Sequence, residues 1–169
     1  MPQSDAKLSI TNLWKVYGAH PSQILEPQWR DKSRKEIQDE TGHVIALRDV
    51  DFDVNEGETF VVMGLSGSGK STLARCLLRL IEPTKGEIVF DGEDIMSYNH
   101  RRLIDFRRHK TGMVFQRFGL MPHRSAQDNV AWALEIQGID KTTRDDRAQE
   151  LLEMVGLNGW ENSYPYQLS

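Results

Sequence analysis

The sequence predicts an α/β fold in which strands lead through a glycine-rich loop into helices. One observation is the alternation of apolar and polar residues over 7–17 and 44–54, which is typical of strands with one polar face. A second is the continuous apolar run Thr59–Met63, which suits a central strand buried on both faces. The third is a helical spacing of apolar residues in three later segments, residues 100–110, 125–138 and 142–155.

The composition is that of a globular domain. The chain has 169 residues, of which 38% are hydrophobic, and a net charge of −4, so nucleic acid is not an expected partner. The single cysteine, Cys76, excludes an intrachain disulfide and is expected in the core. No apolar stretch approaches the roughly 18–20 residues of a membrane span, and the first residues lack a signal-sequence pattern. We therefore expect a cytosolic chain that acts at a membrane only with a partner.

Shorter elements are expected between these segments. The helix over 71–81 should stop before Pro83, which cannot continue it. A β-rich run at 86–90 leads into an Asp-Gly pair at 91–92, which predicts a hairpin turn. Residues 112–115 predict a further short strand.

Two segments are rich in charge. Residues 18–42 carry prolines and charges of both signs, which favours a solvated loop or a short helix over a binding tail. Residues 100–110 are the most basic stretch, but the whole chain is acidic and Phe106 lacks aromatic neighbours there, so a solvated helix face is favoured over a nucleic-acid site. The histidines show no paired spacing of the kind found in zinc sites, so zinc is not expected.

The strongest motif is Gly64–Ser71, which reads Gly-Leu-Ser-Gly-Ser-Gly-Lys-Ser and matches the phosphate-loop pattern G-x-x-x-x-G-K-[ST]. It directly follows the predicted strand Phe60–Met63 and opens the predicted helix, which is the setting that the motif requires. This setting disfavours the alternative, a glycine-rich turn with an incidental lysine.

Each residue type in this loop has a physical role in holding phosphate. Lys70 would place a mobile ammonium between the β- and γ-phosphates, and Ser71 offers a hydroxyl oxygen to Mg²⁺. The N–H groups of residues 67–71 can form an anion nest, and the helix dipole adds up to about 2 kcal/mol for a favourable charge. Glycine allows a positive φ and a close approach to the ligand at three positions, Gly64, Gly67 and Gly69.

Further motifs around this loop resemble those of the ATP-binding subunits of ABC transporters. The run Val-Phe-Gln at 114–116 stands where that family has its Q-loop glutamine, and Tyr17, in Lys-Val-Tyr-Gly at 15–18, matches the aromatic residue that stacks on adenine. Residues 83–92 resemble the hairpin after the phosphate-loop helix, and residues 164–169 resemble the run into the signature L-S-G-G-Q. The resemblance covers nearly the whole chain.

The resemblance implies roles for two residues outside the loop. It implies that Gln116 touches Mg²⁺ and the attacking water and senses the membrane subunit, and that Tyr17 stacks on adenine. From the residues alone, Tyr17 could be a strand-end aromatic and Gln116 a plain loop amide. The residues expected to hold ATP are Tyr17, Gly64, Leu65, Ser66, Gly67, Ser68, Gly69, Lys70, Ser71 and Thr72, with Ser71 and Gln116 at Mg²⁺.

Finer features resemble one branch of that family, the glycine betaine/proline (quaternary amine) importers. These features are Met63–Thr72, Leu80–Thr84, Gly119–His123, Ser163–Pro165 and the insert 18–42. The resemblance implies an ATP-binding, energy-coupling subunit of an importer for compatible solutes such as glycine betaine, proline or choline-like amines. It also implies membrane-spanning permease subunits, a second ATP-binding subunit and, indirectly, a solute-binding protein, at the inner face of the cell membrane. An importer for amino acids or another polar solute is the alternative.

One departure from the family limits the expected activity. The sequence stops at Ser169, inside the signature, before the family's Walker B strand, catalytic glutamate and switch histidine. We therefore expect an incomplete ABC ATPase domain, which binds ATP without efficient hydrolysis, and a non-hydrolysing nucleotide-binding fragment is a further alternative. The expected division is a nucleotide-binding core with an antiparallel β subdomain over 1–116 and a partial helical subdomain over 117–169.

The segment 116–123 is unusually apolar for a loop, since it includes Phe118, Leu120 and Met121. The resemblance implies that a short helix of the membrane subunit docks here. The alternative is that these side chains anchor the helical subdomain to the core, which would close them to solvent.

Overall fold

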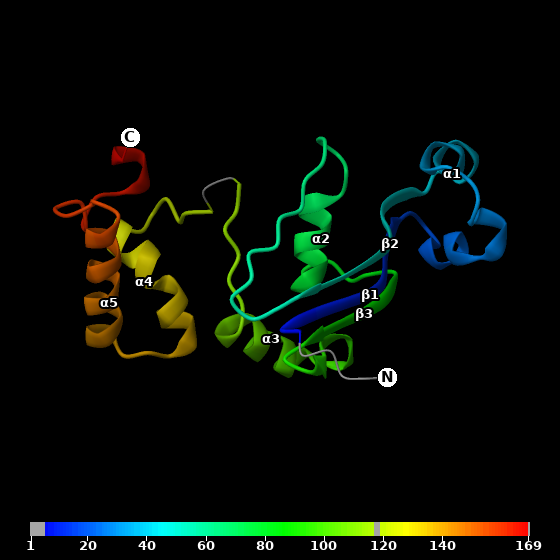
Figure 1. Cartoon of the computed structure of the whole chain (residues 1–169). Helices are drawn as coiled ribbons and strands as arrows, with labels where there is room; N and C mark the ends of the chain where they lie inside the picture. Colours follow the sequence, from blue (N-terminus) through cyan, green and yellow to red (C-terminus); the bar gives the residue numbers. More distant parts are fainter. Residues whose placement is uncertain (1–5, 117–118, 169) are drawn as a thin grey trace. The chain divides into compact units, whose positions relative to one another are not determined.

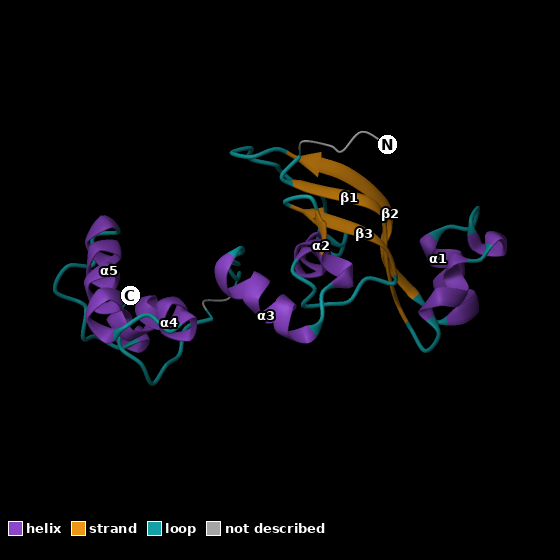
Figure 2. Ribbon diagram, turned by 90° about the horizontal axis from the view of Figure 1, so that it is seen from below, coloured by secondary structure: helices purple, strands orange, loops and turns teal. Residues whose placement is uncertain are grey.

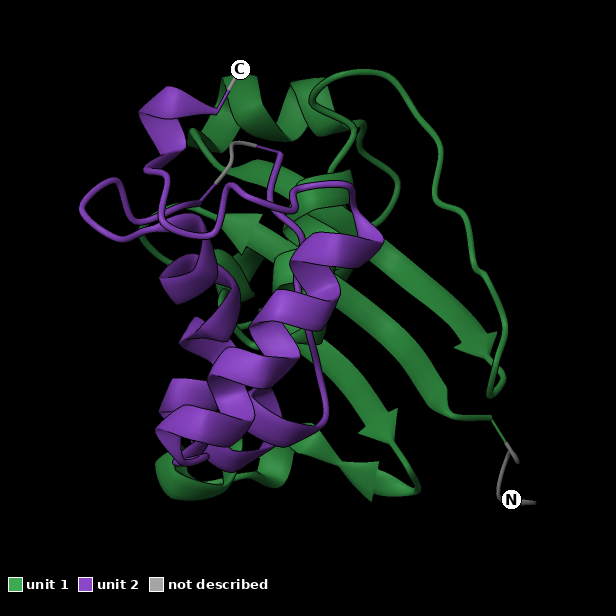
Figure 3. Ribbon diagram, turned by 90° about the vertical axis from the view of Figure 1, so that its left-hand side faces the viewer, with its two compact units in different colours: residues 1–103 green, residues 104–169 purple. Residues whose placement is uncertain are grey.

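Figure 1 shows the computed structural model of the chain, which describes residues 6–116 and 119–168. The chain forms two compact units, and the boundary between them in the sequence lies between Leu103 and Ile104. Figure 3 colours the two units separately. The predicted functional division after residue 116 stays a prediction. Within the described residues, no helix has both the length and the apolar character that crossing a membrane requires.

The first unit is built on an antiparallel sheet with the strand order β2-β1-β3-β4 (Figure 2). The strands are β1 (Leu8–Tyr17), β2 (Val44–Val54), β3 (Lys85–Phe90) and β4 (Glu93–Asp94). The alternating segments and the hairpin are therefore confirmed, and both turn residues, Asp91 and Gly92, have the positive φ that a tight hairpin needs.

The sheet is distorted around Asn12, where β1 shifts its register against both neighbouring strands. Asn12 and Asp49 both have left-handed backbones, with φ of 50° and 51°. The Asn12 side-chain amide donates to the Asp49 carboxylate across the β1–β2 ladder. On the other side of β1, Gly86 of β3 comes so close that a Cβ there would lie 2.6 Å from Cα of Leu13.

The insert between β1 and β2 contains the predicted short helix. Its elements are η1 (Pro21–Leu25), η2 (Pro27–Trp29) and α1 (Arg34–Thr41). A capping box formed by Ser33 and Glu36 starts α1, and Gly42 ends it with a left-handed backbone.

Two isoleucines fix this insert to the sheet. Ile24 and Ile37 are buried in a cluster with Val16 of β1 and Ile45 of β2, and Trp29 packs against the cluster. The insert is therefore not a solvated segment along its whole length, because burying these side chains stabilises its contact with the sheet.

The helix α2 (Lys70–Leu77) lies beside the sheet and ends before the predicted Ile81. Its end is set by Arg79, which has a left-handed backbone with φ of 48°. The Arg79 guanidinium donates to the Glu82 carboxylate at 3.0 Å. It also donates to the carbonyl oxygen of Ile95, the first residue of η3 (Ile95–Ser97), at 2.9 Å. The left-handed residue ends the helix before Pro83 is reached, and the N–H of Leu80 closes this end by donating to the Arg75 carbonyl oxygen at 2.9 Å.

The predicted central strand over 59–63 and the predicted short strand over 112–115 are not strands in the structure. Residues 59–63 and 112–115 are loops, in which Val61 is 66% exposed, Met63 86% and Val114 98%. A central strand needs hydrogen-bonded neighbours at its edges, and no segment among the described residues pairs with either run. The prediction is wrong here because an apolar composition cannot replace those neighbours.

The second unit is a packed pair of helices, α4 (Ala126–Gln137) and α5 (Lys141–Met154). The helix α3 (His100–His109) runs across the boundary between the units, and η4 (Pro165–Gln167) follows α5. The predicted helices are thus confirmed. Side-chain caps start both packed helices, because Ser125 accepts the N–H of Asp128 and Asp140 accepts the N–H of Thr143.

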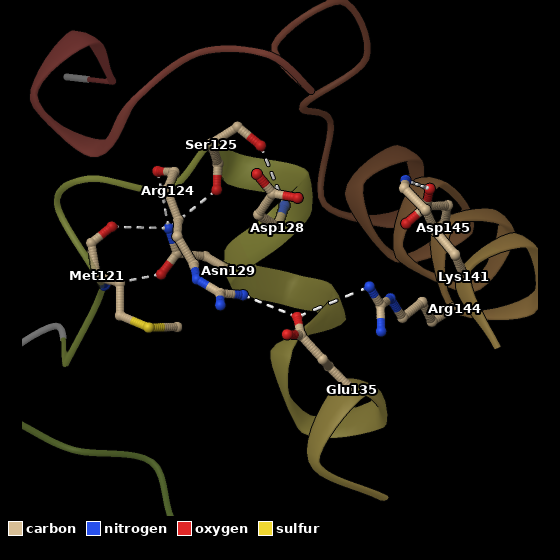
Figure 4. A network of polar contacts seen from close by, with 9 residues as sticks. All are labelled: Met121, Arg124, Ser125, Asp128, Asn129, Glu135, Lys141, Arg144 and Asp145. Atoms are coloured by element: carbon tan, nitrogen blue, oxygen red, sulfur yellow. Dashed lines mark hydrogen bonds and ion pairs between the residues drawn. The ribbon is translucent and has the colours of Figure 1, made fainter. Parts of the chain in front are cut away.

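A polar network joins α4 and α5 (Figure 4). The Glu135 carboxylate accepts from the Arg124 guanidinium at 2.8 Å and lies 3.9 Å from that of Arg144. The Arg124 guanidinium is also 4.3 Å from the centroid of the Trp132 ring. The hydrogen bond from Arg124 lowers the pKa of Glu135 below its usual value.

We expect the second unit to lose stability at acid pH through Glu135. Because its pKa is lowered by folding, the carboxylate stabilises the fold above its unfolded-state pKa of about 4.3, and this contribution is lost as the pH falls through the lower, folded-state value. Glu135→Gln should therefore melt at a lower temperature at pH 7 and show a flatter decline of Tm towards about pH 3. Glu153→Gln, on an exposed position of α5, is the control. Superimposable pH profiles for Glu135→Gln and the parent chain would contradict this account.

Candidate functional site

A tight loop, Gly64–Gly69, leads into the first turn of α2 in the first unit. Gly67 and Gly69 have left-handed backbones, with φ of 80° and 105°, as predicted. Gly64 does not, so the prediction of a positive φ at that position is wrong. A Cβ at Gly64 would lie 2.7 Å from the Ser68 hydroxyl oxygen, so a larger residue there would require the Ser68 side chain to move.

Gly69 seats the loop against the sheet. A Cβ at Gly69 would lie 2.4 Å from the carbonyl oxygen of Ala46 and 3.3 Å from the Leu47 side chain, both in β2. One turn into α2, the buried Leu73 donates its N–H to the Gly69 carbonyl oxygen at 2.8 Å. The missing side chain at Gly69 therefore lets the start of α2 rest directly on β2.

Lys70 curls back over the loop. Its Nζ donates to the carbonyl oxygens of Gly64 at 2.7 Å and Leu65 at 2.8 Å, and it lies 3.4 Å from Oγ of Ser68. In the described part of the chain, no carboxylate pairs with this ammonium. An anionic group in the loop would meet an unneutralised ammonium together with the N–H groups of the first turn of α2, which have no carbonyl partner within the helix.

Ser71 and Thr72 follow in the first turn of α2, where Ser71 is exposed and Thr72 half-buried. A hydroxyl oxygen is the kind of ligand that Mg²⁺ prefers. The residues present therefore fit the predicted group, since Ser71 would hold Mg²⁺ while Lys70 and the loop N–H groups would hold phosphate.

Cys76 lies in the same helix and is fully buried, as predicted. Burial raises the pKa of its thiol to about 11. The thiol therefore stays protonated near neutral pH, and Cys76 belongs to the packing of α2 rather than to the chemistry of the loop.

Tyr17 ends β1, opposite Val44 of β2, and is 40% exposed. Two residues after Val44 in β2, Ala46 is the residue that contacts the loop at Gly69. The Lys15 ammonium lies 4.9 Å from the centroid of the Tyr17 ring. Tyr17 and the loop thus share one pair of strands, and stacking of Tyr17 on adenine stays a prediction.

A buried histidine that the sequence analysis did not single out fixes the residue after Tyr17. A Cβ at Gly18, whose φ is 150°, would lie 2.1 Å from Cδ2 of His43. The Nε2 atom of His43 accepts the N–H of His20 at 3.4 Å, while its Nδ1 is buried with no hydrogen-bond partner in the structure described. No sequence pattern marks this contact, because it joins the two ends of the insert.

Gln116 is exposed and lies in the second unit, whereas the loop lies in the first. Its role at Mg²⁺ and water therefore stays a prediction. In the segment 116–123, Phe118 lies outside the described residues, Leu120 is 48% exposed and Met121 is half-buried. The main chain of Met121 is held by the Asn129 side chain, through contacts of 2.8 and 3.1 Å, which no sequence motif indicated (Figure 4).

The final segment resembling the family's signature is described only in part, because Ser169 lies outside the described residues. A family model described as ABC transporter matches residues 47–169, a range that includes the phosphate loop and Gln116. The chain belongs to the ABC transporter family. The resemblance predicted from the motifs is confirmed.

Several curated relatives in the ABC transporter family carry solute names. The chain is 48% identical over 164 residues to the glycine betaine/carnitine transport ATP-binding protein GbuA of Listeria monocytogenes, covering 97% of the chain and 41% of GbuA. It is 48% identical over 162 residues to the trimethylamine N-oxide transport system ATP-binding protein TmoW of Ruegeria pomeroyi, covering 96% of the chain and 47% of TmoW. It is 44% identical over 136 residues to the methionine import ATP-binding protein MetN 2 of Enterococcus faecalis, covering 80% of the chain and 39% of MetN 2. The chain thus spans less than half of each relative.

A solved ABC cassette shares the fold. The dimeric structure of a post-hydrolysis state of the ATP-binding cassette MJ0796, bound to ADP and Pi, matches with a TM-score of 0.75 and 31% identity, over 96% of this chain and 63% of that one. The predicted α/β class, a P-loop hydrolase core with antiparallel β and helical subdomains, is therefore confirmed at the level of the family.

Proposed function

We propose that this chain binds Mg²⁺-ATP through residues 64–72 and serves as part of the energy-coupling ATPase subunit of an importer for compatible solutes. The observation that carries the proposal is the geometry at Lys70. Its ammonium is held over a glycine loop that β2 seats at the start of α2, and no carboxylate among the described residues neutralises it. A phosphate group supplies the missing negative charge.

Each residue of the loop has a distinct task in this proposal. Lys70 exchanges its two carbonyl contacts for charge-assisted hydrogen bonds to phosphate, and the N–H groups after Gly67 line the same anion. When bound, Mg²⁺ draws the phosphate oxygens together and neutralises part of their charge, with Ser71 as its protein ligand. Gln116 would position water, and Tyr17 would stack on the base.

The solute class is inferred from the relatives. The glycine betaine and trimethylamine N-oxide proteins match over 96–98% of the chain, whereas the methionine proteins match over 80–82%. Quaternary amines and related compatible solutes are therefore favoured over amino acids. In this role the chain acts at the inner face of the cell membrane, with permease subunits and a second ATP-binding subunit as direct partners. A solute-binding protein is an indirect partner.

A chimera tests the solute class. Residues 1–169 would replace the matching part of GbuA, in cells that lack GbuA but keep its transport partners, and radiolabelled glycine betaine uptake would be measured. We expect uptake to return, and Lys70→Ala in the same chimera to remove it, while Lys35→Ala on the exposed face of α1 leaves it intact.

A second chimera, with MetN 2 and methionine uptake, provides the contrast. We expect it to fail, because its partners belong to another solute. Methionine uptake in the second chimera without glycine betaine uptake in the first would overturn the assignment of solute class.

A further inference from the structure

A cavity of about 360 Å³ lies in the first unit, between the insert and the sheet. Its walls come from β1, β2 and β3, from the end of η1 and from the insert residues that follow η1. No residue of the loop 64–72 lines it. Its volume falls in the usual range for small-molecule sites, which is about 300–1,000 Å³.

The strands on one side of the cavity and the insert on the other are each held in place by specific backbone features and hydrogen bonds. On the sheet side, the left-handed residues Asn12 and Asp49 interrupt the β1–β2 ladder at its rim. On the insert side, the Arg48 guanidinium of β2 donates to three carbonyl oxygens, those of Trp29 at 3.2 Å, Arg30 at 2.7 Å and Lys32 at 2.8 Å. These bonds fix the insert at a set distance from the sheet, so the space between them is built into the fold.

Positive charge exceeds negative charge in the lining of this space. Arg30, Arg48 and Lys85 all face the cavity, and in the part of the chain that the structure describes none of them forms an ion pair with a carboxylate. Arg48 is bonded only to uncharged carbonyl groups. The two carboxylates in the lining each accept an amide hydrogen bond, Glu26 from Gln28 and Asp49 from Asn12, and both keep their negative charge. With three cations against two carboxylates, the lining has a net positive charge, and Arg30 and Lys85 are the cations with no carbonyl or carboxylate bond among the described residues.

Three apolar side chains also line the cavity, those of Trp14, Ile24 and Leu25. Trp14 is half-buried, with the Arg48 guanidinium 5.7 Å from its ring centroid, whereas Ile24 is buried. A guanidinium over an indole ring makes a surface on which a planar group can stack. A ligand that satisfies both parts of the lining carries a negative charge at one end and a planar or apolar group at the other.

We propose that this cavity binds a small organic anion, with its anionic group between Arg30 and Lys85 and its apolar part against Trp14. Charged hydrogen bonds to an anion are worth about 1.5–3 kcal/mol each, so loss of one cation should weaken binding about tenfold. The proposal does not depend on nucleotide binding, because the cavity and the loop share no residue.

Benzoate is a suitable probe, since acetate has its charge without the ring and benzamide has its ring without the charge. Binding would be followed in the full chain by the NMR signal of the Trp14 indole N–H, assigned with Trp14→Phe. We expect benzoate to shift this signal saturably, with an affinity about tenfold above that of acetate or benzamide. Arg30→Gln and Lys85→Gln should each weaken benzoate about tenfold, whereas Arg34→Gln, on α1 outside the cavity, and Lys70→Ala should not.

Three results would overturn the proposal. The first is the absence of a saturable benzoate shift below about 10 mM, which would mean a binding energy under about 3 kcal/mol. The second is benzamide binding as tightly as benzoate. The third is an equal loss in Arg34→Gln and in the two cavity variants, which would indicate a general charge effect. Because Lys70→Ala blocks the loop alone, failure here is distinguishable from failure of the nucleotide site.

Discussion

Gly69→Ala is expected to abolish nucleotide binding by the loop. The new Cβ would lie 2.4 Å from the carbonyl oxygen of Ala46, and this contact is with the backbone of a strand, which cannot turn aside as a side chain can. The φ of 105° adds a conformational cost of about 1–3 kcal/mol for a residue other than glycine. To relieve both, the loop must leave β2, so we expect affinity for Mg²⁺-ADP to fall at least about a hundredfold in calorimetry.

Gly67→Ala is the matched control for this variant. Gly67 also has a left-handed backbone, with φ of 80°, but a Cβ there meets nothing within 4 Å. It therefore carries the conformational cost without the collision, and we expect a loss of about tenfold or less. Equal affinities for the two alanine variants would show that contact with β2 does not shape the site.

Gly86→Ala is expected to have the largest effect on the stability of the first unit. Its Cβ would lie 2.6 Å from Cα of Leu13 and 2.7 Å from the carbonyl oxygen of Asn12, both backbone atoms of β1, which lies between β2 and β3. With φ of 115° as well, the substitution combines overpacking with backbone strain. We expect the free energy of unfolding in urea to fall by about 3 kcal/mol or more.

Gly92→Ala, in the neighbouring hairpin turn, separates the two causes. Gly92 has φ of 76° but open space around its Cβ position, so its loss should be about 1 kcal/mol. Chemical denaturation followed by far-ultraviolet circular dichroism would give both values. A loss at Gly86 no larger than that at Gly92 would contradict the close approach of β1 and β3.

The sequence predicts those elements whose signals are local. Period-two alternation locates β1 and β2, the Asp-Gly pair locates the β3–β4 turn, and the helical spacing of apolar residues locates α4. Each of these signals acts within a few residues of the chain. The structure departs from prediction where distant partners decide, as in the run 59–63, which is apolar enough for a central strand but has no paired neighbour among the described residues.

Long-range contacts also explain the other differences. Burial of Ile24 and Ile37, for example, depends on their meeting β1 and β2. At the site, the motif identifies the loop, but not Ala46, whose carbonyl is the surface against which Gly69 rests. Backbone contacts of this kind leave no residue type by which a sequence pattern could reveal them.

Calorimetric titration of the chain with Mg²⁺-ADP, comparing Lys70→Ala with Lys35→Ala, tests the central claim most directly. Lys70 supplies a charge-assisted contact to phosphate in this account, whereas Lys35 lies on the exposed surface of α1. We expect Lys35→Ala to bind like the parent chain and Lys70→Ala to bind at least about tenfold more weakly, since such a contact is worth about 1.5–3 kcal/mol. Equal affinity of both variants for Mg²⁺-ADP would contradict the assignment of the loop as the nucleotide site.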